Sequence, residues 1–223
     1  RAQGKYEAAE QLYLQAIEIK KVALPENHPS LAADLNDLAG LYRAQGKYEA
    51  AEQLYLQAIE IKKVALPENH PSLAADLNDL AELYKSQGKY KAAELFYRQA
   101  IKIHKIALPE NHSERANGLN NLAELYRAQG KYKAAEHLYL QAIEIDKIAL
   151  PENHPGIATI LNNMASLYYA QGKYEAAEPL FLQVIEIFTQ SLGEEHPYTQ
   201  TVLENYQIFL NKKNESKQNK DKY

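Results

Sequence analysis

The sequence predicts an all-α fold, a superhelix of antiparallel helix pairs that ends in a capping helix. Three observations support this prediction. The sequence repeats with a period of 42 residues, and no insertion or deletion interrupts the spacing. Apolar residues within each repeat recur three and four positions apart, the period of an amphipathic helix. Proline and glycine recur at fixed positions between these segments, where they mark helix starts and ends. A constant period of this length is typical of a solenoid.

Two short motifs and one long identity define the repeat. Residues 1–39 recur without change as residues 43–81. Gln-Gly-Lys-Tyr begins at positions 3, 45, 87, 129 and 171. Leu-Pro-Glu-Asn-His begins at positions 24, 66, 108 and 150, and a changed copy, Leu-Gly-Glu-Glu-His, begins at position 192. These copies predict a single solenoid domain over residues 1–210 with about five repeats, the first of them truncated.

The first helix of a repeat is predicted over residues 29–45. Leu31, Leu35 and Leu38 fall on one face of it. Pro29 suits the first turn, where its missing N–H is not needed, and Asn27 or His28 can cap the helix. The glycine at position 46 supplies the left-handed residue that ends it.

The second helix is predicted over residues 48–65 and stops before Pro67, because a residue before proline disfavours the helical region. Ala51 and Ala58 place small side chains where paired helices approach closely, and Tyr55 fills the space beside them. Neither helix can bury its apolar face alone. Stacking of the pairs therefore forms the core.

Two features distinguish the last repeat. Pro179 lies inside the fifth second helix, where we expect a small kink and no break, although a mid-helix proline typically costs about 3 kcal/mol. A final helix over residues 197–210 has no following partner and is predicted to cap the array. Residues 211–223 contain five lysines and no aliphatic side chain, so we expect a disordered tail.

Composition excludes several classes of function. No apolar run is long enough to span a membrane. The net charge of −4 gives no sign of the basic surface that nucleic-acid binding requires. The chain has no cysteine, which excludes disulfides and thiolate metal sites. We expect a cytoplasmic protein, and the first residues resemble the end of an interrupted helix, which suggests a piece of a longer chain.

Chemical motifs do not point to catalysis. Five histidines recur in the turns between repeats, at positions 28, 70, 112, 154 and 196. Because they lie one repeat apart, they cannot converge on one ion, and capping is favoured over metal binding. The sequence has no catalytic triad, phosphate loop or zinc motif. We expect no enzyme activity, no metal and no cofactor.

The repeat carries a family resemblance. Residues 119–143, LNNLAELYRAQGKYKAAEHLYLQAI, followed by the Leu-Pro-Glu-Asn-His turn, resemble the 42-residue tetratricopeptide repeats of kinesin light chains and related bacterial, notably cyanobacterial, proteins. The resemblance covers residues 1–210. It implies a right-handed superhelix whose first helices line a concave groove, and it implies binding of peptides or protein surfaces.

The candidate groove residues lie on the first helices, opposite the core face. Their positions vary between copies, whereas core positions barely change. The predicted peptide-binding residues are Asn36, Arg43, Asn78, Glu82, Lys85, Asn117, Asn120, Asn121, Glu124, Arg127, Asn162, Asn163 and Tyr169.

Two subsets of these residues have competing interpretations. Four asparagines, at positions 36, 78, 120 and 162, can pair with the backbone of an extended peptide or can bond the neighbouring repeat. A basic row of Arg43, Lys85 and Arg127 can attract an acidic group of a ligand. Alternatively, it can pair within its helix with Glu82 and Glu124 or be solvated.

We therefore expect a protein-interaction scaffold that binds a partner protein or peptide in the groove. The alternative is a spacer or self-association module of a larger protein. In that case the exposed ends stack weakly between molecules, whereas a pure groove binder stays monomeric.

Overall fold

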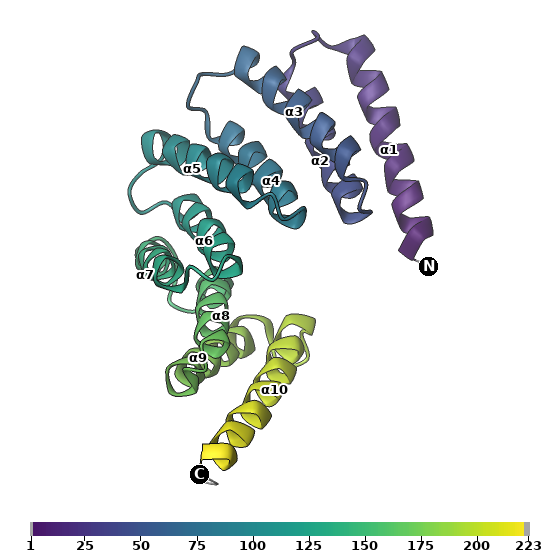
Figure 1. Ribbon diagram of the computed structural model, residues 1–223. Coiled ribbons are helices and arrows are strands. Elements are labelled where there is room, and N and C mark those ends of the chain that lie inside the picture. Colours follow the sequence, from purple (N-terminus) through teal and green to yellow (C-terminus); the bar gives the residue numbers. More distant parts are fainter. Residues whose placement is uncertain (1, 221–223) are drawn as a thin grey trace. The chain divides into compact units, whose positions relative to one another are not determined.

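The computed structural model describes residues 2–220 and contains ten α-helices and no strand in that range. The pairs α2 and α3, α4 and α5, α6 and α7, and α8 and α9 pack as helix hairpins (Figure 1). The all-α class and the pairing predicted from the sequence are confirmed. The helices are α1 (Ala2–Ala23), α2 (Pro29–Ala44), α3 (Tyr48–Ala65), α4 (Pro71–Ser86), α5 (Tyr90–Ala107), α6 (Ser113–Ala128), α7 (Tyr132–Ala149), α8 (Pro155–Ala170), α9 (Tyr174–Leu192) and α10 (Pro197–Lys220).

Histidine and glycine residues at fixed positions of the repeat mark the ends of the first helices. The Nδ1 atom of His28 accepts a hydrogen bond of 3.2 Å from the Ser30 backbone N–H, so this histidine caps α2. The corresponding histidine caps α4, α6 and α8 in the same way. Gly46 follows α2 with a φ of 74°, a left-handed conformation that a side chain disfavours. Each first helix thus starts and ends at the same point of the repeat.

Small residues allow the helices of a hairpin to approach closely. Ala39 on α2 and Ala51 and Ala58 on α3 have no exposed surface. Tyr55 on α3 is also fully buried and packs in the same core as Leu80 of α4. The α2–α3 hairpin therefore buries its apolar residues within the pair and against the next repeat of the first unit.

The chain divides into two compact units at residues 109 and 110. The first unit contains α1 to α5, and the second contains α6 to α10. The core of the first unit is mainly leucine, alanine and tyrosine, whereas the end of the second unit is built around Phe181 and Phe209. This aromatic end of the core shapes the last hairpin.

The last hairpin also contains the internal proline. Helix α9 runs without a break through Pro179, as expected, and ends at Leu192, which is followed by Gly193 with a φ of 90°. A fully buried Thr199 near the start of α10 donates a hydrogen bond of 3.4 Å to the carbonyl of Phe188 on α9. This contact joins the start of α10 to the end of α9.

Helix α10 is longer than the sequence predicted. It continues beyond residue 210 through most of the segment expected to be disordered, and residues 221–223 of that segment lie outside the described residues. Lys213 Nζ lies 2.6 Å from Glu178 Oε2 on α9, and Lys212 pairs with Glu215 one turn along the helix. Charged residues here make contacts that composition alone did not reveal.

Helix α10 also differs from the other first helices at two core positions. Positions 32 and 39 of the repeat unit hold fully buried alanine in α2, α4, α6 and α8. The corresponding residues of α10 are Gln200 and Gln207, and both are exposed. These larger polar side chains keep another helix from packing closely, which fits a capping role.

Candidate functional site

The first helices expose one face, which carries the predicted groove residues. In α2, Ala33 and Asp37 are exposed, whereas Asn36 and Arg43 are half-buried. The same graded exposure recurs in the later first helices, where Asn117 of α6 is exposed. The remaining predicted residues are half-buried except the buried Asn120: Asn78, Glu82, Lys85, Asn121, Glu124, Arg127, Asn162, Asn163 and Tyr169.

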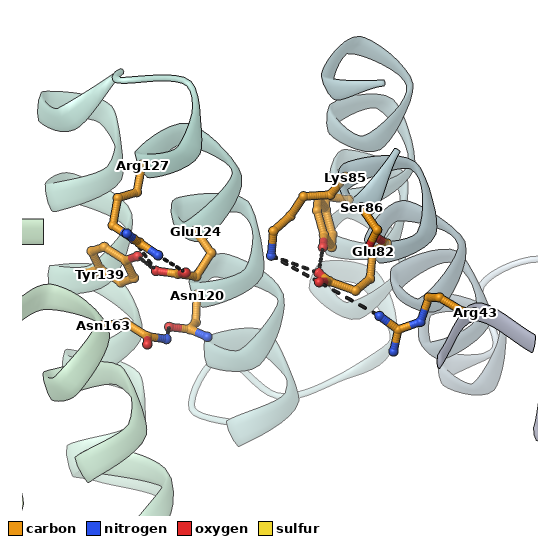
Figure 2. A network of polar contacts seen from close by, with 10 residues as sticks. Arg43, Glu82, Lys85, Ser86, Asn120, Glu124, Arg127, Tyr139 and Asn163 are labelled. Atoms are coloured by element: carbon orange, nitrogen blue, oxygen red, sulfur yellow. Dashed lines mark hydrogen bonds and ion pairs between the residues drawn. The ribbon is translucent and has the colours of Figure 1, made fainter. Parts of the chain in front are cut away.

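Asparagine amides join adjacent first helices inside each unit. Asn36 Nδ2 donates a hydrogen bond of 2.8 Å to Asp79 Oδ2, which links α2 to α4. Asn163 Nδ2 donates a hydrogen bond of 3.0 Å to Asn120 Oδ1, which links α8 to α6 (Figure 2). Asn36 and Asn120 thus follow the neighbouring-repeat interpretation. Each of these amides ties together two helices of the proposed binding face.

Two of the three cations of the basic row, Lys85 and Arg127, are paired within their own helices. Arg127 of α6 makes a two-pronged contact with Glu124, through Nε at 2.9 Å and Nη2 at 2.8 Å. Lys85 Nζ of α4 lies 3.2 and 3.0 Å from the two carboxylate oxygens of Glu82 (Figure 2). The predicted intrahelical pairing is therefore present at both positions. The cations are compensated, so this face carries little net positive charge there.

A buried tyrosine from the second helix of the same hairpin also contacts the glutamate of each ion pair. The hydroxyl of Tyr97 on α5 donates a hydrogen bond of 2.6 Å to Glu82 Oε2, and the hydroxyl of Tyr139 on α7 donates one to Glu124. We call each set of acid, cation and tyrosine a Glu–Tyr–cation cluster. Sequence reasoning assigned these tyrosines to the core alone. A glutamate lies fifteen residues before each tyrosine, and this spacing in the sequence could have indicated the hydrogen bond.

Hydrogen bonding controls the charge of Glu82 in the cluster of α4 and α5. Burial opposes ionisation of Glu82, but the hydrogen bonds from Tyr97 and Lys85 outweigh it and lower the pKa of the carboxyl group. Burial and the same carboxylate raise the pKa of the Tyr97 hydroxyl. The glutamate is therefore ionised and the tyrosine neutral near pH 7.

The cluster changes in the repeat formed by α2 and α3. Gly40 stands where α4 has Glu82, and the hydroxyl of Tyr55 lies 3.6 Å from the place a Cβ on Gly40 would occupy. Arg43, without an acid on its own helix turn, reaches Glu82 of α4 at 4.0 Å (Figure 2). The predicted basic row is thus connected to the next repeat at this point.

The cluster is lost in the repeat formed by α8 and α9. Ser166 stands in the position of the glutamate, Phe181 in that of the tyrosine and Tyr169 in that of the cation. The ring of Tyr169 packs against Tyr174 and Phe209, with ring centroids 5.9 and 6.1 Å apart. A polar, charged site in the earlier repeats is therefore an aromatic site here.

A buried ion pair between repeats was not predicted. Lys62 Nζ of α3 lies 2.6 Å from Asp76 Oδ1 of α4, and both side chains are almost fully buried. Lys20 and Asp34 repeat the pair between α1 and α2 at 2.7 Å, with greater exposure. Burial raises the pKa of Asp76 to about 6, against the opposing effect of Lys62. The recurrence of lysine and aspartate fourteen residues apart was the available signal.

These hairpins and shared inter-repeat contacts define an α-helical repeat protein. One tetratricopeptide repeat model matches residues 1–63, and another matches residues 74–114, 115–156 and 157–198. The chain belongs to the tetratricopeptide repeat family. Repeats of this family are in general protein-interaction modules and are typically not catalytic.

Solved structures support the same assignment. The chain is similar to the nearly identical TPR-like repeats of a candidate kinesin light chain from Podosopora anserina, with 29% identity over 86% of this chain and 90% of that chain and a TM-score of 0.67. A single-substitution variant of that protein gives 29% identity over 85% of this chain and 90% of that chain and a TM-score of 0.69.

A second solved relative shares the fold at lower identity. BtubC (BKLC) from P. vanneervenii is 22% identical over 100% of this chain and 94% of that chain, with a TM-score of 0.74. The search of curated proteins gave no match. Within the described residues, no helix combines the length and apolar character that crossing a membrane requires.

Proposed function

We propose that this chain is a protein-interaction scaffold whose first-helix faces bind a segment of a partner protein. The segment is extended or a short helix. The proposal applies to the faces of α2 and α4 in the first unit and of α6 and α8 in the second. The candidate contacts are the groove residues named above.

The contrast between constant and variable positions carries the proposal. The buried residue at positions 32, 74, 116 and 158 is alanine in every copy. The next residue is exposed and is Ala33, Ala75, Asn117 or Thr159. Packing thus holds the inner face constant, whereas the exposed position is alanine in both repeats of the first unit, asparagine in α6 and threonine in α8. A surface of this kind distinguishes positions along a bound chain.

The chemistry of the face suits an uncharged backbone. Lys85 and Arg127 are compensated by Glu82 and Glu124, so they attract an acidic group weakly. A guanidinium group has five N–H donors, and the contacts of Arg127 with Glu124 leave others for carbonyl groups. Exposed Asn117 offers both donor and acceptor. An extended peptide presents the complementary groups along its length.

Paired substitutions on the two helix types test the proposal. A peptide is first selected from a random display library against the folded chain, and its Kd is measured by calorimetry. Ala75→Arg on α4 and Asn117→Arg on α6 alter exposed first-helix positions. Gln57→Arg on α3 and Gln141→Arg on α7 are matched controls at exposed second-helix positions.

We expect one or both first-helix variants to weaken binding by about tenfold or more, because an added arginine side chain occupies the binding face. The controls should stay within about twofold. All four variants should retain the helical circular dichroism spectrum. Equal effects from both helix types, or none from either, would show that the first-helix faces do not bind the peptide.

A second candidate function, self-association, is favoured by one observation. Helix α1 has the same sequence as α3 over residues 6–23 and 48–65. Ile61 of α3 is 7% exposed, whereas the equivalent Ile19 of α1 is 67% exposed, as is Leu12. This apolar surface on α1 can pair with α1 of a second copy. A head-to-tail contact would instead pack α1 of one copy against α10 of another. The exposed Gln200 of α10 disfavours such close packing.

Light scattering across concentration tests this candidate. If α1 mediates self-association, the mass should rise above 25.3 kDa with concentration for the unaltered chain. The variant Ile19→Lys should then remain monomeric, because a charge cannot be buried in that contact. A constant monomer mass for the unaltered chain would exclude self-association.

A further inference from the structure

The second unit contains a cavity between α8, α9 and α10 with a volume of about 240 Å³. It includes the predicted groove residues Asn162 and Tyr169, but four of its seven lining residues lie on α9 and α10, outside that prediction. The lining residues are Asn162, Ser166, Tyr169, Phe181, Asn205, Ile208 and Phe209.

The cavity lies where the last repeat has lost its Glu–Tyr–cation cluster. In α4 and α6, a glutamate side chain extends from the position of Ser166 to meet the tyrosine hydroxyl. Serine is shorter than glutamate, and Phe181 has no hydroxyl to bring an acid inward. The three substitutions together remove the groups that occupy this place in the two preceding hairpins.

The lining is apolar inside and polar at its edge. Phe181 and Phe209 are buried, with ring centroids 5.1 Å apart, and Tyr169 packs on Phe209. Ile208 is 60% exposed at the rim, where Asn205 supplies an amide. None of the lining side chains is charged. A charged group entering the cavity would lose hydration without gaining a counter-ion there.

The volume is sufficient for a large side chain. An apolar cavity of about 150 Å³ accepts benzene. The amides of Asn162 and Asn205 at the edge can bond the peptide groups on either side of an inserted residue. Aromatic walls favour an aromatic or bulky aliphatic group through ring contacts and apolar burial.

We propose that this cavity is an anchor site for one large uncharged side chain of a partner peptide, closed on one side by the capping helix α10. The inference rests on the proposed peptide-binding function and adds its specificity. The charged cluster of α6, in the same unit, contacts the peptide backbone, whereas the cavity selects an apolar residue at one position.

Small amino-acid derivatives test the cavity directly. The probes are the N-acetyl amides of phenylalanine, leucine and glutamate, added to the isotopically labelled chain and followed by NMR. We expect the phenylalanine and leucine probes to shift the resonances of Ser166 and Asn205. The glutamate probe should leave them unchanged. Shifts with all three probes, or with none, would overturn the inference.

Restoring the missing cluster provides the decisive variant. Ser166→Glu with Phe181→Tyr and Tyr169→Arg recreates the set found in α6 and α7. It should weaken probe binding by about tenfold, since a ring contact and apolar burial are lost together. Ile208→Glu, at an exposed site, should do the same without altering the core. Ala170→Glu, exposed on α8 outside the cavity, is the control and should bind normally.

The outcomes separate this inference from the proposed function. A selected peptide that binds the first-helix faces while both cavity variants bind it normally would overturn the anchor site alone. Loss of peptide binding in the first-helix variants and also in Ile208→Glu supports both proposals. Absence of any first-helix effect, with probe binding retained, would contradict the scaffold function and leave a small-molecule cavity.

Discussion

The ammonium group of Lys62 lies 2.6 Å from the carboxylate of Asp76, and this buried pair joins the second helix of one repeat to the first helix of the next. Lys20 and Asp34 form the same pair one repeat earlier, at 2.7 Å, where the two side chains are 31% and 15% exposed. The chain thus contains one ion pair twice, in two degrees of burial.

Removing the lysine should therefore have unequal effects. Lys62→Met leaves the Asp76 charge buried without its partner, which costs about 3–5 kcal/mol. The Lys20–Asp34 pair is more exposed to water, so we expect a smaller loss for Lys20→Met, of about 1 kcal/mol or less. Urea unfolding followed by circular dichroism measures both. Similar losses for the two variants would show that burial does not control the strength of this pair.

Asp146 should make the second unit sensitive to pH. It occupies the position of Lys62 in the repeat, is almost fully buried, and has Ile160 at the position corresponding to Asp76. Burial raises the pKa of Asp146, against the positive charge of His154. The folded chain therefore holds this proton to a higher pH than the unfolded chain, whose pKa is about 3.9. The protonated Asp146 carboxyl group therefore contributes its full stabilisation of the folded chain below a pH of about 3.9. This stabilisation is lost as the pH rises through the pKa of Asp146 in the folded chain.

The variant Asp146→Asn removes this dependence. Its Tm should exceed that of the unaltered chain at pH 7, and the difference should shrink at pH 4. Thermal melts at the two pH values check the prediction. A gain that is the same at both pH values would mean that ionisation of Asp146 is not the cause.

The hydroxyl of Tyr97 should contribute measurably to stability. Tyr97→Phe removes the hydrogen bond to ionised Glu82, and bonds to charged groups are worth about 1.5–3 kcal/mol. Tyr55→Phe is the comparison variant, because Gly40 stands where an acid would accept and the Tyr55 hydroxyl interacts with Arg43 instead. Chemical unfolding should show the greater loss for Tyr97→Phe, and the reverse order would contradict the role assigned to the cluster.

The capping role of His70 at the start of α4 can be tested by removing or replacing its hydrogen-bond acceptor. His70→Ala removes the acceptor for the Ser72 N–H, and loss of a helix cap costs about 1 kcal/mol. His70→Asn keeps a side-chain acceptor at the same place and should restore most of that stability. Equal destabilisation by the two variants would show that the imidazole acts through packing instead of capping.

Sequence reasoning predicted the helices well because their signals are local. Pro29, Gly46 and the leucines three and four residues apart determine one helix without reference to the rest of the chain. The length of α10 could not be predicted in this way. Its continuation brings Lys213 onto Glu178 of α9, a contact between residues far apart in the sequence that no local pattern reveals.

The candidate site was predicted in outline only. The face of the first helices follows from the helical period, and pairing of Arg127 with Glu124 follows from their spacing. The hydroxyl of Tyr139 on Glu124 depends on how a second helix packs against its own first helix, which the period does not specify. The cavity beside Phe181 depends on α10 as well, so it arises only from the assembled unit.

Cross-linking of a bound peptide tests the central claim most directly. The selected peptide carries a photoreactive benzophenone residue, and mass spectrometry locates the cross-linked residues on the chain. The scaffold function predicts cross-links on exposed first-helix residues such as Ala75, Asn117 and Thr159, with few on α3, α5 or α7. Cross-links concentrated on those second helices would contradict it.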